Sequence, residues 1–165
     1  MSTLSQNNLE GQRALVTGAT SGIGRAVALQ LARDEAEVLV HGRDAARGAE
    51  TVEEITASGG RARFVAADLS DPAQLDDLAE QAGPVDVLVN NAGFSWFGPT
   101  AELDVATFDR LFAANVRAAY FLVAALAPKM AARGAAASSA SGAWPARLAW
   151  PAPLPTARPR RPWWR

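Results

Sequence analysis

The stretch that decides the fold lies at residues 14–26 and reads ALVTGATSGIGRA. Its first three residues form a short apolar run typical of a buried strand, and a glycine-rich turn follows at once. Ala26, Val27, Leu29 and Leu31 then open a helical pattern. A strand, a glycine turn and a helix start in this order form a binding site for phosphate groups, because glycines admit an anion close to the backbone and the helix start offers unpaired N–H groups. The alternative is an ordinary strand-to-helix turn that happens to hold three glycines.

The composition fits one globular domain. The chain has 165 residues, of which 49% are hydrophobic, and this is enough to bury a sizeable core. It has no cysteine, which excludes disulfides and thiolate chemistry, and we expect no metal site. Residues 1–12 are polar and lack the apolar region of a secretory signal, and the longest apolar run, residues 118–128, is too short to span a bilayer. We therefore expect a cytoplasmic protein without a membrane partner.

Hydrophobic periodicity predicts strands and helices in alternation. Strands are expected at residues 13–17, 37–41, 61–67 and 85–89. Helices are expected at residues 22–34, 44–58, after a cap at Ser70 or Asp71, and at 104–131. This order predicts an α/β fold, a doubly wound parallel sheet of about four strands with helices on both faces. The domain would cover residues 1–133, followed by an irregular, disordered tail at 134–165.

Polar signals gather at the predicted carboxyl ends of the strands. The glycine turn follows the first strand, Gly42 and Arg43 follow the second, Asp68 follows the third, and the sequence NNAG at residues 90–93 follows the fourth. Ligands of open parallel sheets bind at this edge. The sequence therefore predicts a nucleotide site there.

These residues together resemble the short-chain dehydrogenase/reductase family. Residues 17–24, TGATSGIG, are similar to its nucleotide motif, and residues 90–93 to its second motif. Asp68 stands where the family has an aspartate that bonds the adenine amino group. Asn115 matches the asparagine that supports the catalytic lysine through a water. Four such matches in the right order are specific, they cover about residues 10–133, and they imply a Rossmann-like fold.

The resemblance implies a set of site residues. Asn115 is the one implied for catalysis. The residues implied for cofactor binding are Gly18, Thr20, Ser21, Gly22, Ile23, Gly24, Arg43, Asp68, Leu69, Asn90, Ala92 and Gly93.

Several of these residues also have a structural interpretation. Asp68 can serve only to start a helix, Asn90 can bond across the sheet, and Asn115 can be a satisfied amide in the core. His41 is the one histidine and ends the second strand, where it is a cofactor-edge or a structural residue rather than a base or a metal ligand. The aromatic residues at 94–97 indicate packing or a substrate-loop surface.

The residue pair after the second strand bears on the choice of cofactor. A carboxylate there would hold the ribose hydroxyls of NAD and repel a 2′-phosphate. The chain has Gly42 and then Arg43, whose guanidinium suits bidentate phosphate binding. We therefore expect NADP, with NAD less favoured; a solvated surface arginine is the alternative.

The pattern of the family breaks after the long helix. The family's chemistry uses a serine and a Tyr-x-x-x-Lys pair, with hydride passing between nicotinamide and a carbonyl carbon. Here the one tyrosine, Tyr120, lies inside the predicted long helix and the one lysine, Lys129, stands nine positions on. No catalytic tyrosine or lysine is predicted.

From Gly134 onward the composition also changes. Six of the ten prolines and four of the five tryptophans lie there, and all nine ionised side chains after residue 109 are basic. A basic arm for nucleic acid or a membrane is one interpretation. We favour a frameshift in GC-rich DNA, because suitable codons for residues 135–143 and 153–162 permit, in a shifted frame, the family's fifth strand and its Tyr-x-x-x-Lys pair. The coding DNA decides this hypothesis.

Two functions follow from the resemblance. The first is an NADP-dependent oxidoreductase acting on a small carbonyl or alcohol substrate, with catalysis crippled in this chain. The alternative is a dinucleotide-binding fragment or pseudo-enzyme without turnover. We expect no nucleic-acid partner, and association into a homo-oligomer through the helix at 104–131.

Overall fold

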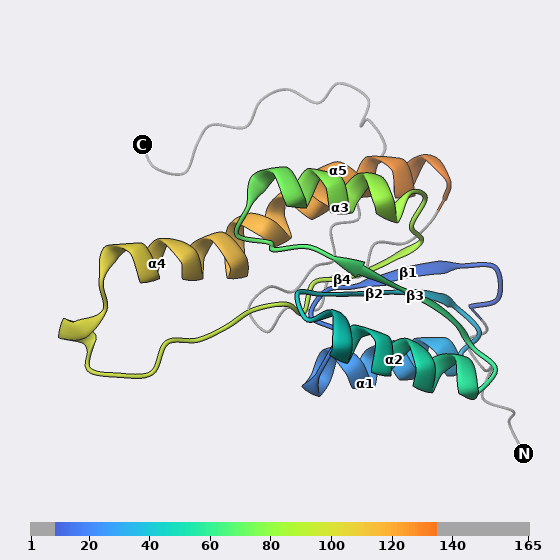
Figure 1. The fold of residues 1–165 in the computed structure, drawn as a ribbon. Helices are drawn as coiled ribbons and strands as arrows, with labels where there is room; N and C mark the ends of the chain where they lie inside the picture. The colour runs from blue at the N-terminus through green and yellow to red at the C-terminus, as the bar shows by residue number, and fades with distance from the viewer. Residues whose placement is uncertain (1–8, 135–165) are drawn as a thin grey trace, which may run out of the picture.

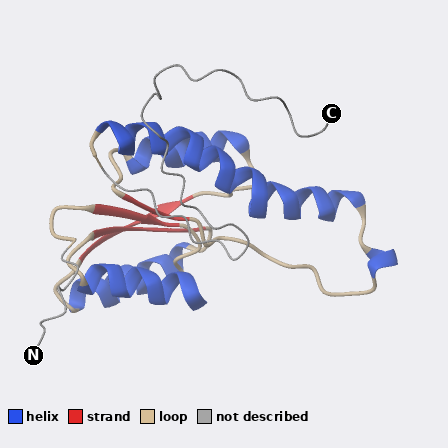
Figure 2. Ribbon diagram, turned by 180° about the vertical axis from the view of Figure 1, so that it is seen from behind, coloured by secondary structure: helices blue, strands red, loops and turns tan. Residues whose placement is uncertain are grey.

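The computed structural model describes residues 9–134, and they form a four-stranded parallel sheet between two layers of helices. The strands are β1 (Arg13–Val16), β2 (Glu37–Gly42), β3 (Arg61–Ala66) and β4 (Val87–Val89), in the spatial order β3-β2-β1-β4. Helices α1 (Gly22–Arg33) and α2 (Ala45–Ala57) cover one face of the sheet, and α3 (Pro72–Ala82) and α5 (Ala118–Ala132) cover the other (Figures 1 and 2). The predicted parallel α/β fold is confirmed.

The two central strands are buried on both faces. Every residue from Ala14 to Val16 and from Val38 to Val40 has no exposed surface. Leu15 and Leu39 pair in register and belong to the core on the α3 and α5 side, whereas their neighbours in each strand belong to the core on the α1 and α2 side. Burial on both faces explains why these strands read as continuous apolar runs rather than alternating ones.

Aspartates cap the helices that follow strands and loops. The Asp44 carboxylate accepts from the amides of Ala46 and Arg47 at the start of α2. Asp71, and not Ser70, caps α3 by accepting from the Ala73 amide. Helix α4 (Val105–Phe112) begins in the same way at Asp104. Each carboxylate pairs an amide that the first helical turn leaves without a backbone partner.

The predicted long helix is interrupted. A π-helical segment, η2 (Ala113–Arg117), separates α4 from α5, and a short 3₁₀ turn, η1 (Thr100–Glu102), precedes α4. A π turn holds more residues than an α turn, so it rotates the apolar side of the helix. In α4, Phe108 and Phe112 are 45% and 52% exposed. Helix α4 projects beyond the sheet, away from the other helices (Figure 1).

The second half of the predicted long helix, α5, packs one face into the core. Leu122, Leu126 and Met130 are almost fully buried and pack in the core with residues of α3. By length and composition alone, Val105–Ala132 is the one helical stretch among the described residues that is long and apolar enough to cross a membrane. The apolar run at residues 118–128 is one part of this stretch, and packing in the core accounts for part of its apolar surface.

The predicted tail at residues 134–165 lies outside the described residues apart from Gly134.

Candidate functional site

The turn between β1 and α1 has an uncapped helix start. Gly18 and Gly22 have φ of 66° and 54°, a backbone conformation that favours glycine. Ser21 occupies the N-cap position, but its side chain makes no capping bond. The first amides of α1 therefore have no side-chain partner, and Ile23 is 77% exposed beside them. Free amides and the positive end of a helix dipole suit an anion.

The shape of the turn depends on Gly24. A Cβ at Gly24 would lie 2.3 Å from the Gly18 carbonyl oxygen, whereas a Cβ at Gly22 would meet nothing within 4 Å. The space over Gly22 is thus open, and the opposite side of the turn is packed without a gap. This arrangement fits a diphosphate resting on the helix start.

Hydrogen bonds between Thr17, at the start of the glycine turn, and the end of β4 hold the turn in place. The Thr17 hydroxyl donates to the Val89 carbonyl and accepts from the amides of Asn91 and Ala92, each at 3.0 Å. The Asn91 side-chain amide donates to the carbonyls of Thr17 and Gly18, at 3.1 and 3.3 Å. Asn91 was missed as a site residue by sequence reasoning; its position beside the predicted nucleotide turn was the available signal.

The neighbouring Asn90 has a different environment. It is 3% exposed, and among the described residues its side-chain nitrogen Nδ2 has no hydrogen-bond partner. The expected bond across the sheet is therefore not seen within residues 9–134. A buried amide without a partner is costly, so a partner for it is expected in the assembled site.

Asp68 follows β3 and lies in an ordered turn. Its Oδ1 accepts from the backbone amide and the hydroxyl of Ser70, at 2.9 and 2.8 Å. These bonds hold the pKa of the Asp68 carboxyl below its ordinary value, and the nearby charge of Arg43 acts in the same direction. Asp68 is thus ionised, and it orders the loop that leads to α3 without being the N-cap of that helix. Leu69 beside it is buried.

The end of β2 lies against the glycine turn. A Cβ at Gly42 would come within 2.4 Å of the Thr20 methyl group, so the missing side chain makes room for Thr20. Arg43 is exposed and, within the described part of the chain, makes no hydrogen bond or ion pair with another side chain. An exposed guanidinium without such a bond can bind a phosphate at the same edge of the sheet.

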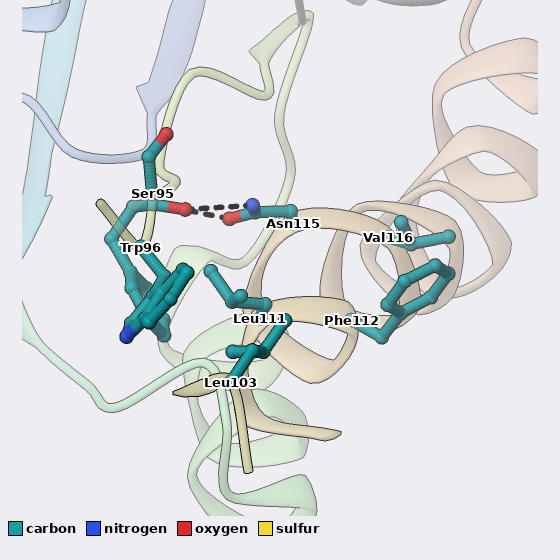
Figure 3. A pocket seen from close by; sticks show the side chains of 8 residues that line it. Ser95, Trp96, Leu103, Leu111, Phe112, Asn115 and Val116 are labelled. Atoms are coloured by element: carbon teal, nitrogen blue, oxygen red, sulfur yellow. Dashed lines mark hydrogen bonds between the residues drawn. The ribbon is translucent and has the colours of Figure 1, made fainter. Parts of the chain in front are cut away.

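Asn115 lies in the π-helical segment, next to the loop that follows β4. Its Oδ1 accepts from the Phe94 amide at 3.0 Å, and its Nδ2 donates to the Phe94 carbonyl at 2.8 Å (Figure 3). A Cβ at Gly93 would lie 3.0 Å from the same oxygen. The side chain therefore fastens the loop after β4 to the long helix; its amide is satisfied, but it is exposed and does not lie in the core. Its support of a lysine stays a prediction.

A cavity of about 330 Å³ opens beside Asn115, between the loop after β4 and helix α4 (Figure 3). Its walls are mainly apolar and aromatic, and this size suits a small organic group. The lining residues are Phe94, Ser95, Trp96, Leu103, Leu111, Phe112, Asn115 and Val116. They include no acid or base, so these described residues offer no group for proton transfer.

The carboxyl edge of the sheet thus defines a class of protein. It brings together free helix amides, an exposed guanidinium and an ionised carboxylate, and free amides at a helix start suit the diphosphate of a dinucleotide. The fold and this edge define an α/β protein of the dinucleotide-binding kind. The profile of the family described as short chain dehydrogenase matches residues 12–143, and the chain belongs to that family.

Relatives agree with this assignment. An L-rhamnose 1-dehydrogenase (NAD(P)(+)) from Sphingomonas sp. (strain SKA58) is 40% identical over 131 residues, which is 76% of this chain and 52% of the relative. A metagenomic short-chain oxidoreductase in complex with NADP is 40% identical, with a TM-score of 0.76 over 80% of this chain and 62% of that one. A 3-oxoacyl (acyl-carrier-protein) reductase from Agrobacterium tumefaciens C58, with NADP bound, is 35% identical, with a TM-score of 0.77 over 84% and 55%.

The chain spans about half the length of the curated relatives it matches. It is similar to their N-terminal strand and helix repeats.

Proposed function

We propose that this chain binds NADP(H) across the carboxyl edge of its sheet, with the diphosphate over the amides of residues 18–24. The observation that carries the proposal is the start of α1, which has no side-chain cap and open space above Gly22. Family membership and solved relatives that hold NADP support it.

The remaining cofactor contacts follow from the same placement. Asp68 and Leu69 would receive the adenine, with the ionised carboxylate of Asp68 accepting from the adenine amino group. Asn90, Ala92 and Gly93 would border the nucleotide where β4 ends. The orphaned Nδ2 of Asn90 supports this part of the proposal, because a buried donor needs an acceptor.

The choice of NADP over NAD rests on β2. Gly42 leaves no carboxylate to repel a 2′-phosphate, and the free guanidinium of Arg43 is exposed next to it. A hydrogen bond to a charged group contributes about 1.5 kcal/mol or more, which is about tenfold in affinity.

The chemistry proposed for the lineage is hydride transfer between a nicotinamide and a small carbonyl or alcohol substrate. The nicotinamide, when bound, supplies or accepts the hydride. The sequence given has no Tyr-x-x-x-Lys pair, and Tyr120 is 69% exposed in α5 with no resolved partner other than the ring of Phe121. We therefore propose binding without turnover for this chain, and turnover through another proton donor as the alternative.

We also propose a cytoplasmic location. We further propose that copies of the chain associate into a homo-oligomer through the helix at 104–131. An exposed apolar stripe along this helix favours association. Its members are Val105, Phe108, Phe112, Val116 and Tyr120.

The test is calorimetric titration of the full chain with NADP+ and with NAD+, followed by NADPH oxidation assays over a panel of ketones. We expect saturable binding with NADP+ preferred and no turnover. Arg43→Ala should weaken NADP+ binding about tenfold and leave NAD+ binding within about twofold. Arg61→Ala is the matched control, because Arg61 is also exposed but begins β3 at the opposite end of the sheet. Equal effects of the two variants would reject the role of Arg43.

A further inference from the structure

The one histidine of the chain is fixed in a single protonation state by its two neighbours. His41 is 2% exposed at the end of β2. Its Nδ1 lies 3.3 Å from the backbone nitrogen of Gly18, and its Nε2 lies 3.1 Å from the carbonyl oxygen of Ala67. Because an amide only donates and a carbonyl only accepts, Nδ1 must be bare and Nε2 must carry the proton. The geometry therefore requires a neutral imidazole.

The position of this ring connects two halves of the candidate site. Gly18 belongs to the glycine turn, and its carbonyl is held from the other side by Asn91. Ala67 directly precedes Asp68, which lies in the loop proposed to receive adenine. The backbone nitrogen of Ala19 also donates to the His41 carbonyl, at 2.8 Å. The ring thus bridges the strand ends of β1 and β3 across β2.

We propose that His41 is a positioning residue for the dinucleotide: its neutral imidazole sets the glycine turn at a fixed distance from the loop that begins at Ala67. This inference rests on the proposed function, because both segments are assigned to the cofactor there. A ring protonated on both nitrogens has no acceptor for the Gly18 amide, so it would release the turn. His41 does not touch the reacting atoms in this assignment.

The surroundings keep the ring neutral. Burial lowers the pKa of His41 to about 4, while the bond to Ala67 and the charge of Asp68 act in the opposite direction. The glycine turn contributes no charged side chain, and Arg43, which directly follows β2, acts on Asp68. Between pH 5 and pH 8 the imidazole therefore stays in the form that accepts from Gly18.

Two variants separate the two bonds of the ring. His41→Asn places an amide oxygen near the position of Nδ1, which keeps an acceptor for Gly18. His41→Gln reaches the position of Nε2, which keeps a donor for Ala67 and leaves the Gly18 amide without its partner. Each variant keeps only one of the two bonds that set the distance and leaves the other partner buried without a hydrogen bond, so we expect both to bind NADP+ about tenfold more weakly than the unaltered chain.

The experiment is ¹⁵N NMR of the imidazole in the free full chain, combined with NADP+ titration of the three proteins. The free chain should show a protonated Nε2, a bare Nδ1, and no titration between pH 8 and pH 5. Protonation near the ordinary pKa, or equal NADP+ affinity in all three proteins, would overturn the inference. Failure of the unaltered chain to bind NADP+ at all would instead reject the proposed function.

Discussion

Replacement of Gly24 by alanine tests the packing of the nucleotide turn. Gly24 is buried in the first turn of α1. Helix propensity alone predicts that alanine stabilises this position by about 1 kcal/mol. The structure predicts the opposite sign, because the added Cβ would lie 2.3 Å from both the Gly18 carbonyl oxygen and the Asn91 side-chain nitrogen.

The magnitude follows from the contacts that must move. Overpacking against an immobile backbone oxygen costs about 1–3 kcal/mol. Asn91 must also shift, which weakens its bonds to Thr17 and Gly18, each contributing about 1 kcal/mol. After subtraction of the propensity gain, we expect a net loss of about 2 kcal/mol, or a Tm lower by about 4–8 °C.

The assay is thermal unfolding of both proteins, followed by titration with NADP+. Gly24→Ala should lower the Tm and weaken NADP+ binding at least tenfold, because the amides of the turn are displaced. Gly59→Ala is the control: Gly59 has a φ of 84° and no neighbour within 4 Å of a Cβ, so it should lower the Tm through backbone strain alone and leave binding unchanged. A Gly24→Ala protein that melts at or above the unaltered chain with full affinity would refute the reasoning.

Three further perturbations give distinct outcomes. The pKa of His41 in the folded chain, about 4, lies below its unfolded value of 6.5, so the unfolded chain binds the proton more tightly. The free energy of unfolding should therefore fall by about 3 kcal/mol as the pH drops from 6.5 to 4. Urea unfolding across this pH range should show a smaller fall for His41→Asn. Asn91→Ala should lower the free energy of unfolding by about 1–2 kcal/mol and weaken NADP+ binding, and an unchanged urea midpoint would count against its role. Phe112→Glu should shift the chain toward monomers in sedimentation velocity, because Phe112 is 52% exposed on the apolar stripe.

The strands could be predicted closely from the sequence. The first three predicted strands begin at the same residues as β1 to β3 and differ from them by one residue at the carboxyl end. The apolar runs of β1 and β2 are continuous because these two strands are covered on both faces, whereas β3 carries Arg61 and Arg63 and is partly exposed; glycine or acidic residues mark the turns. The fourth strand is shorter than predicted, since Val85 is buried but precedes β4.

The long helix could be predicted in extent but not in its interruption. A period of 3.6 residues was assumed from residue 104 to 131, and the π-helical turn at Ala113–Arg117 breaks that period. Asn115 pairs with the backbone of Phe94, a contact over 21 residues that no local pattern reveals. The aromatic side chains Phe108 and Phe112 are exposed on α4, which projects beyond the sheet (Figure 1).

The candidate site could be predicted in its position and only partly in its contacts. The sequence indicated the glycine turn, Arg43 and Asp68 because each follows a strand. The roles of Asn91 and His41 depend on which strands are neighbours, and the sheet order β3-β2-β1-β4 supplies that information. Contacts between segments far apart in the sequence are therefore what the structure adds.

The most direct test of the account is an amide NMR titration of the ¹⁵N-labelled full chain with NADP+. The account predicts that the amides of Gly18, Gly22, Ile23 and Gly24 shift together and saturate with the affinity measured by calorimetry. Shifts confined to the cavity beside Asn115, or no shift at the glycine turn at saturating NADP+, would contradict it.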